Sequence, residues 1–453
     1  MIRLFDTQFS EIREIEPKEA GKFSIYVCGP TVYDRPHLGH GRFVLVYDIL
    51  RRFLAYQGFD VRFISNITDI DDKILDRASK EGISPKEVAD TYEQVWWETL
   101  DRLGVMRPDE APHATDWLAE MVELIELLIE SGAAYSTPEG VYFEVEKAPG
   151  YGLLARQDLS ELRAGARVEV VQTKRSPFDF ALWKLVESDE WGWQSPFGYG
   201  RPGWHTECVV MALGLLGEGF DLHGGGLDLC FPHHENERIQ AVASGREFAR
   251  HWMHNGFVMV GDEKMSKSLG NFETLENLLE RFDSRSYRLL VLRSHYRSPM
   301  DVTPENSEDA ERALERIDAF ARRFTDLCER NHTVGADEGA MSRFVAAMSE
   351  DLNTPVALSY AFEAITGANG SMDRGQRDKA VAYAKAALAQ LEILGLVVES
   401  KIDVPADVVA LAELRVAARR AKDYALADNY RQEILDLGYV VEDAGSGFGF
   451  RRA

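Results

Sequence analysis

The chain has 453 residues, a formal net charge of −24 and an apolar share of 45%, with four cysteines. This length predicts several domains, and the apolar share is ordinary for a protein with full cores. Four cysteines in so long a chain fit no disulfide framework. We recognise neither a signal peptide nor an apolar run that could cross a membrane, so we expect a soluble protein of the cytoplasm.

The first predicted strand, Ser24–Cys28, is followed by a Gly-Pro turn, a loop, and a helical pattern from about Gly39 to Tyr56. A strand, loop and helix in this order aim backbone N–H groups and the positive end of a helix dipole at phosphate. His37 and His40 are three residues apart, which places both imidazoles on one face of the first helical turn. There they can donate hydrogen bonds to phosphate oxygens while an α-phosphoryl group is attacked.

A second strand is predicted at Asp60–Ser65, and it runs into a polar loop, 66–73, that opens a helix. Ligands of parallel sheets gather at the carboxyl ends of the strands, where we expect Cys28 and Thr68. The predicted fold class is therefore α/β, with a Rossmann-like nucleotide-binding domain whose first half is residues 1–120.

Residues 121–200 are predicted to be an insertion in this domain. A helix at Met121–Glu130 precedes short strands with Gly and Pro between them, such as Tyr142–Val145 and Val168–Val171. Glycine and proline at such positions are typical of turns between strands. We expect a connective region here, after which residues 201–250 complete the nucleotide-binding domain.

Four residues with metal-binding side chains fall near these elements: Cys28, Cys208, His233 and Glu237. A helix that starts near Pro232 would put His233 and Glu237 on one face. Two thiolates, an imidazole and a carboxylate suit zinc. The alternative, which the spacing does not exclude, is that the two cysteines are small buried core residues. On spacing alone, Cys230 and His234 are rival ligands.

A second motif, Lys-Met-Ser-Lys-Ser at residues 264–268, follows the apolar run Phe257–Val260 and lies in a polar loop. Its two lysines, Lys264 and Lys267, can neutralise the charge that builds on a departing pyrophosphate. Alone, this motif would be explained as an exposed basic turn, and the first motif, His-Leu-Gly-His at residues 37–40, as a helix start with a close-packed glycine. Together and in this order, they predict the two halves of an ATP site that forms acyl-adenylates.

The remaining C-terminal part of the chain is predicted to be mostly helical. Residues 251–305 carry the second motif and a linking region, and from 306 to 400 apolar positions such as Ala313 and Ile317 recur at helix spacing. We expect a helical bundle there, and a small α+β module at 401–453 in which a hairpin follows a helix.

The charge of −24 does not exclude a nucleic-acid partner, because counterion release requires only local basic contacts. Basic residues cluster near the C-terminus, and two aromatic residues accompany the last of them: Arg415, Arg419, Arg420, Lys422, Arg451 and Arg452, with Phe448 and Phe450. Single-stranded bases stack on aromatic residues of this kind. On this pattern alone, a solvated helix face and an ordinary tail are the simpler interpretation.

Seven stretches of the chain carry a resemblance to a known family: residues 26–34, 37–40, 66–73, 201–208, 223–226, 231–237 and 264–271. With them, the chain closely resembles the bacterial cysteinyl-tRNA synthetases, a family of class I aminoacyl-tRNA synthetases. The resemblance implies ligation of L-cysteine to tRNA(Cys) with Mg²⁺-bound ATP, through an adenylate. It also implies that the C-terminal module binds the anticodon and that the protein is a monomer.

The same resemblance implies roles for individual residues. The zinc ligands at the floor of the amino-acid pocket would be Cys28, Cys208, His233 and Glu237. The contacts to the substrate cysteine would be Thr68, Trp204 and Asp228. The catalytic residues would be His37, His40, Lys264 and Lys267. The ATP contacts would be Gly39, His40, Lys264, Ser266 and Lys267.

Zinc would explain how cysteine is told from serine or alanine. A methylene-sized difference in an apolar pocket is worth only about 1–3 kcal/mol, whereas a thiolate binds zinc directly. Two rival functions are weighed against this one. A ligase with a small amino-sugar acceptor would share the catalytic domain but lack residues 401–453. A non-catalytic tRNA-binding relative would have no need of both phosphate-site motifs.

Overall fold

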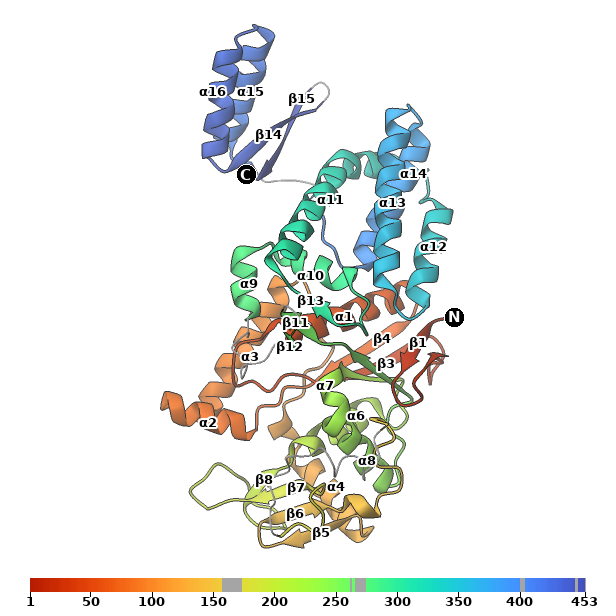
Figure 1. Cartoon of the computed structure of the whole chain (residues 1–453), viewed down its shortest axis with the longest axis vertical. Helices are drawn as coiled ribbons and strands as arrows, with labels where there is room; N and C mark the ends of the chain where they lie inside the picture. Colours follow the sequence, from red (N-terminus) through yellow and green to blue (C-terminus); the bar gives the residue numbers. More distant parts are fainter. Residues whose placement is uncertain (157–172, 261–262, 265–273, 400–403, 445–446, 453) are drawn as a thin grey trace. The chain divides into compact units, whose positions relative to one another are not determined.

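The computed structural model describes residues 1–156, 173–260, 263–264, 274–399, 404–444 and 447–452. The chain forms two compact units (Figure 1). Unit 1 consists of Met1–Leu314 and Val334–Val397, and unit 2 consists of Glu315–Thr333 and Val398–Ala453. The predicted strand at Val168–Val171 lies outside the described residues.

Unit 1 contains a four-stranded parallel sheet in the order β10-β9-β3-β4. Its strands are β3 (Lys22–Val27), β4 (Asp60–Ser65), β9 (Leu222–Gly226) and β10 (His251–Asn255). The two halves of the domain are far apart in sequence, and they meet where β3 pairs with β9. This sheet confirms the predicted α/β, Rossmann-like fold.

Helix α1 (Leu38–Tyr56) follows β3 and packs against both β4 and β9. It also contacts α10 (Ser284–Arg293) and α14 (Arg377–Ile393), so most of its length is buried. Burial on several sides explains why α1 is apolar around much of its circumference. The helix begins one residue before its predicted start and ends where predicted.

The inserted region contains α4 (Leu118–Glu130) and a four-stranded antiparallel sheet. The strands are β5 (Ala134–Thr137), β6 (Gly140–Phe143), β7 (Phe180–Leu185) and β8 (Gly200–Pro202). The strand predicted at Tyr142–Val145 is only partly correct. The backbone N–H of Val145 donates to the Asp179 carboxylate at 3.0 Å, and Val145 begins a short 3-10 turn instead of extending β6.

The helix predicted to start near Pro232 starts later, as α8 (Glu235–Ala243). A wide turn at Cys230–His234 separates it from the short helix α7 (Leu227–Leu229). Phe231 has φ −138° and ψ 133°, because a following proline disfavours the helical region. The start of α8 is thus assigned three residues later than predicted, but Phe231 is the one residue of this turn with non-helical φ and ψ, and the predicted shared face is observed, with 2.9 Å between His233 Nε2 and Glu237 Oε1.

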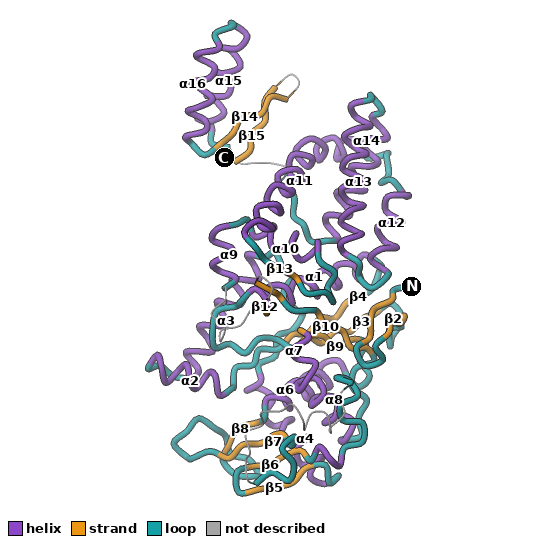
Figure 2. The backbone as a smooth tube through the Cα atoms, in the orientation of Figure 1, coloured by secondary structure: helices purple, strands orange, loops and turns teal. Residues whose placement is uncertain are grey.

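Three short strands form a sheet in the order β12-β11-β13: β11 (Val258–Val260), β12 (Glu263–Lys264), which contains the first residue of the second motif, and β13 (Met300–Asp301). In the chain, α2 (Asp72–Glu81) and α3 (Pro85–Arg102) follow β4, and α9 (Leu275–Arg281) follows β12. Further along the chain, α14 packs with α12 (Glu338–Ser349) and α13 (Thr354–Asp373), as Figure 2 shows. The predicted helical character of this region is thus confirmed.

Unit 2 contains α15 (Ala406–Arg420), α16 (Tyr424–Asp436) and the hairpin of β14 (Tyr439–Ala444) and β15 (Gly447–Arg452). It also includes the later part of α11 (Pro304–Arg330). The predicted order, a helix and then a hairpin, is present. None of the described helices combines the length and the apolarity needed to span a lipid bilayer.

Candidate functional site

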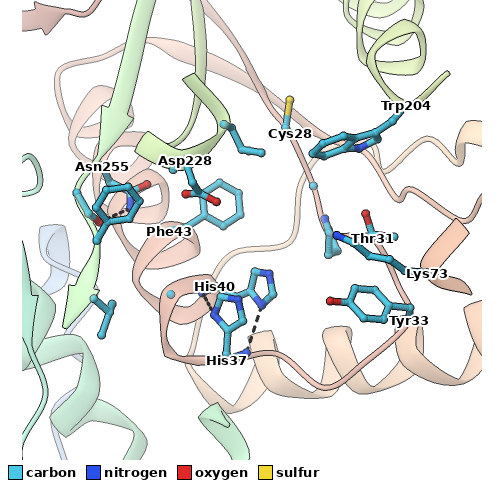
Figure 3. Close-up of a pocket in the computed structure, with 18 residues that line it drawn as sticks. Cys28, Thr31, Tyr33, His37, His40, Phe43, Lys73, Trp204, Asp228 and Asn255 are labelled. Atoms are coloured by element: carbon cyan, nitrogen blue, oxygen red, sulfur yellow. Dashed lines mark hydrogen bonds between the residues drawn. The ribbon is translucent and has the colours of Figure 1, made fainter. Parts of the chain in front are cut away.

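A cavity of about 320 Å³ lies beside the start of α1, next to the carboxyl ends of β3 and β10 (Figure 3). Its lining comes from both halves of the domain, between residues 28 and 73 and between residues 204 and 258. Six of the predicted site residues line it: Cys28, His37, Gly39, His40, Trp204 and Asp228. The cavity therefore brings together residues predicted for phosphate, for cysteine and for metal.

The two histidines of the first motif lie at the start of α1, where His37 is the N-cap and His40 is the third helical residue. The backbone N–H of His40 donates to Nδ1 of His37 at 3.3 Å, and the backbone N–H of His37 donates to Nδ1 of His40 at 3.2 Å. Their rings stack with 3.7 Å between centroids and an angle of 15° between planes. The predicted shared face is thus observed.

The four predicted zinc ligands converge, since one donor atom from each lies within 4.8 Å of the others and all four residues are buried. The Sγ atoms of Cys28 and Cys208 are 3.6 Å apart, and Cys208 Sγ lies 3.7 Å from Nε2 of His233. Oε1 of Glu237 lies 3.3 Å from Cys28 Sγ and 2.9 Å from His233 Nε2. A tetrahedron with zinc–sulfur bonds of about 2.3 Å has a sulfur–sulfur edge of about 3.8 Å, so these side chains fit a zinc ion.

The electrostatics of this cluster also favour a bound cation. Burial raises the pKa of the Cys28 thiol, and it opposes ionisation of Cys208, but hydrogen bonds with Cys28 and His233 bring the pKa of Cys208 to about 7. Burial disfavours a protonated His233, yet Glu237 outweighs this effect and raises the pKa of His233 to about 10. The buried acidic groups are thus balanced by a proton on an imidazole. A metal ion would supply that positive charge and release protons.

A second set of donor atoms overlaps the first: those of Cys28, His223, His234 and Glu237 also lie within 4.8 Å of one another. Nδ1 of His223 lies 3.1 Å from the carbonyl oxygen of Tyr26, so that nitrogen is a donor, while Nε2 lies 2.6 Å from Oε2 of Glu237. A metal-bound histidine commonly donates its other nitrogen to a carbonyl in this way. Because His234 belongs to this second set, it remains a rival metal ligand. His223, for which the sequence predicted no role, is a further candidate ligand.

The other rival, Cys230, belongs to neither set of donor atoms. Its Sγ lies 3.8 Å from the carbonyl oxygen of Leu154, and burial raises the pKa of its thiol to about 12. A neutral, buried thiol of this kind behaves as a small apolar core residue.

Of the three residues predicted to contact the substrate cysteine, two line the cavity and one does not. Trp204, the first residue of α6 (Trp204–Leu216), stacks on His233 with 4.0 Å between ring centroids. Asp228 lines the cavity, but Thr68 is not among the described residues that do so. The Thr68 hydroxyl is buried, where it accepts from the Asn66 amide at 3.1 Å and donates to Glu207 at 2.8 Å.

Several residues that line the cavity were not predicted from the sequence to belong to the site. Lys73 and Tyr33 line the cavity, with Nζ of Lys73 5.3 Å from the centroid of the Tyr33 ring. Thr31, whose backbone pairs with that of Thr68, lines it as well. Lys73 is the second residue of α2, at the end of the polar stretch 66–73 that follows β4, so its position shortly after a strand was a usable signal.

Only the beginning of the second motif is described. Lys264 is the last residue of β12, and its backbone is paired with that of Met259. The other two motif residues with predicted ATP contacts, Ser266 and Lys267, lie outside the described residues.

Among the C-terminal basic and aromatic residues whose side chains the structure describes, some are exposed and others are buried or packed on a core. Arg415 is buried, whereas Arg419 and Arg420 are exposed on α15. Phe448 and Phe450 pack on the core of unit 2, with 5.4 Å between their ring centroids. These two rings therefore contribute to the fold of the hairpin.

Two known protein families match parts of this chain: "tRNA synthetases class I (C) catalytic domain" matches residues 14–312, and "DALR domain" matches residues 343–399. It is 42% identical over 458 residues to the cysteine–tRNA ligase of Thermotoga maritima, covering 98% of this chain and 99% of that one. It is 41% identical over 475 residues to the enzyme of the same name from Thermodesulfovibrio yellowstonii, covering 98% of each. The chain belongs to the cysteine–tRNA ligase family. The protein is thus a class I aminoacyl-tRNA synthetase, as the resemblance of its sequence implied.

Solved structures of other aminoacyl-tRNA synthetases have the same fold as this chain. Mycobacterium tuberculosis methionyl-tRNA synthetase, in complex with methionyl-adenylate, has a TM-score of 0.60 and 16% identity, covering 82% of this chain and 89% of that chain. Agrobacterium radiobacter LeuRS, in a ternary complex with tRNA and LeuAMS, has a TM-score of 0.63 and 11% identity, covering 84% and 85%. At these identities, the similarity concerns the fold alone.

Proposed function

We propose that the protein ligates L-cysteine to tRNA(Cys) with ATP, through cysteinyl-adenylate. The observation that carries this proposal is the single cavity shared by the His37–His40 pair and the Cys28 thiol. The relatives with 41–42% identity over almost the whole chain bear the name of this activity. A cavity that joins a phosphate-binding helix start to a thiol-binding cluster suits a reaction between ATP and cysteine.

In the first step, the carboxylate of cysteine attacks the α-phosphorus of Mg²⁺-bound ATP, and pyrophosphate leaves. His37 and His40 donate hydrogen bonds to the phosphate oxygens, and Gly39 and Ser266 complete the ATP contacts. Lys264 and Lys267 neutralise the pyrophosphate, because preorganised positive charge is what stabilises phosphoryl transfer most.

In the second step, the 2′-hydroxyl of the terminal adenosine of tRNA(Cys) attacks the acyl carbon, and AMP leaves. Trp204 and Asp228 orient the cysteine from the cavity wall, and Thr68, whose backbone pairs with that of the lining residue Thr31, would support that wall. No side chain needs to form a covalent intermediate.

The metal we propose is one zinc ion per chain, held by Cys28, Cys208, His233 and Glu237. Bound there, zinc would accept the substrate thiol as a thiolate, which serine and alanine cannot provide. The side chains of this cluster select the substrate and leave the phosphoryl chemistry to the first and second motifs.

The rest of the chain would serve the tRNA. We assign residues 1–120 and 201–250 to catalysis, and residues 121–200 to the acceptor end. Residues 251–305 would contact the stem, 306–400 would form the supporting bundle, and 401–453 would bind the anticodon. We expect a cytoplasmic monomer.

Cysteine-dependent ATP–pyrophosphate exchange tests this proposal, on protein whose zinc content has been measured and with serine as a competitor, followed by charging of tRNA(Cys). Exchange with one zinc per chain, rejection of serine and a charged tRNA is the expected result. Exchange without charging would instead favour a small-acceptor ligase, and no exchange at all would favour a binding protein.

A further inference from the structure

Arg42 is a buried cation two residues beyond His40 on α1. Its guanidinium donates to four backbone carbonyl oxygens: those of Phe257 at 2.7 Å, His295 at 3.1 Å, Tyr296 at 3.2 Å and Ser298 at 2.5 Å. Burial lowers the pKa of Arg42 to about 10, so the group is still charged at neutral pH. Within the described part of the chain, no carboxylate forms an ion pair with it.

Burying a charged group without a carboxylate partner costs desolvation free energy, and an apolar side chain at the same position would avoid this cost. The geometry of the four bonds is what an apolar residue could not reproduce. A guanidinium is a planar fork with five N–H donors, and it can hold several oxygens at fixed mutual positions.

The carbonyls belong to two backbone segments, one at Phe257 and one at residues 295–298. Gly256 and Phe257 line the same cavity as His37 and His40. The N–H of Gly256 donates to the carbonyl of Tyr296 at 2.8 Å, and a Cβ atom on Gly256 would lie 2.7 Å from the carbonyl oxygens of Arg297 and Ser298. The two segments are therefore in direct backbone contact, and Arg42 ties both of them to α1.

We propose that Arg42 is a positioning residue for ATP, which sets the distance between the helix start carrying His37 and His40 and the part of the cavity wall at residues 255–258. The wall continues into β11, whose partner β12 ends at Lys264. Arg42 would thereby hold the two halves of the nucleotide site in register. This inference rests on the proposed function, because it requires ATP to occupy the cavity.

The test compares Arg42→Lys with Arg52→Lys in the full-length, zinc-loaded protein. The ammonium of lysine keeps the charge, but its three N–H donors sit on one atom and cannot span the four carbonyls. Arg52 lies on the same helix, pairs with Asp48 at 2.9 Å and does not line the cavity, so it is a matched control. The readouts are the KM values for ATP and for cysteine in pyrophosphate exchange, and the fraction of active sites from the adenylate burst.

For R42K we expect a rise in the KM for ATP of about tenfold or more, because a misplacement of about 1 Å can cost a hundredfold. The KM for cysteine and the zinc content should stay within twofold of the wild type, and R52K should match the wild type in every readout. A merely structural role would lower the fraction of active sites while the remaining sites keep the wild-type KM for ATP. That result would overturn the proposal for Arg42, whereas a wild-type protein without exchange would refute the proposed function and this inference with it.

Discussion

His37 and His40 cap each other: Nδ1 of each ring accepts the backbone N–H of the other residue, at 3.3 Å and 3.2 Å. An imidazole nitrogen that accepts a hydrogen bond carries no proton, so each neutral ring bears its hydrogen on Nε2. The start of α1 thus fixes one tautomer for both rings. In that tautomer Nε2 is the donor, as contact with phosphate oxygens requires.

Replacing His40 by Ala should slow adenylate formation about a hundredfold, because one preorganised donor to a transition state is worth about that much. The KM for cysteine should change by less than about twofold, since the metal cluster is built from other residues. Single-turnover kinetics of adenylate formation measure the effect. The control is His332→Ala, an exposed histidine outside the cavity. Equal losses of adenylate formation and cysteine binding would contradict the assigned role.

Replacing Cys208 by Ser should remove most of the zinc, because serine does not ionise readily and is a poor ligand for this metal. Zinc per chain, measured by atomic emission, should fall well below one, and discrimination against serine should fall with it. Cys230→Ala is the matched control, since Cys230 lies in neither donor set and should leave the zinc content at one. Loss of zinc in the control but not in C208S would mean that Cys230 is the true ligand.

The two overlapping donor sets predict different sulfur counts around the metal. The first set supplies sulfur from both Cys28 and Cys208, and the second supplies it from Cys28 alone. X-ray absorption at the zinc edge should therefore detect two sulfur ligands at about 2.3 Å. A single sulfur, together with zinc loss in His223→Ala, would move the metal to the second set.

A buried ion pair predicts a specific dependence of stability on pH. Burial opposes ionisation of Asp48, but Arg288, 2.6 Å away, and Arg52 outweigh it and hold the pKa of the carboxyl below its usual value. A depressed pKa stabilises the fold at pH values above about 3.9, and this contribution is lost as the pH falls through the lower, folded-state pKa.

Replacing Asp48 by Asn should therefore lower the free energy of unfolding at pH 7 by about 3–5 kcal/mol, because it leaves Arg288 buried and unpaired. The difference from the wild type should shrink at the acidic limit. Urea denaturation followed by tryptophan fluorescence measures both values. The exposed pair of Arg293 and Asp309 provides the control, and Asp309→Asn should leave unfolding unchanged within error. A loss in D48N that is the same at every pH would refute the electrostatic explanation.

Local features of the sequence predicted the elements that depend on neighbouring residues. The strand at Asp60–Ser65 and the helix that ends at Tyr56 follow from alternation and helical spacing, and both are present. The helix predicted near Pro232 is assigned from Glu235 as α8, and the i, i+4 spacing correctly placed His233 and Glu237 on one face, where Nε2 and Oε1 are 2.9 Å apart.

Resemblance to a family, rather than spacing, singled out the four predicted zinc ligands from their rivals. Cys28 and Cys208 are 180 residues apart in the chain, and nothing local states that their sulfurs lie 3.6 Å apart. The packing of α6 against β3 brings their segments together, and the pairing of β3 with β9 adds His223 for the second donor set.

The sequence by itself therefore determined the α/β class, the start of α1 and the residue types available for phosphate and metal, because these depend on local spacing and side-chain chemistry. Only the tertiary structure decided which of those residues meet. It buried Thr68 outside the cavity lining, brought Lys73 into that lining, and set Arg42 against four carbonyl oxygens. The bonds of Arg42, like that of Thr68 with Glu207, join segments more than a hundred residues apart, and they are selected by packing and hydrogen-bond satisfaction across the whole fold.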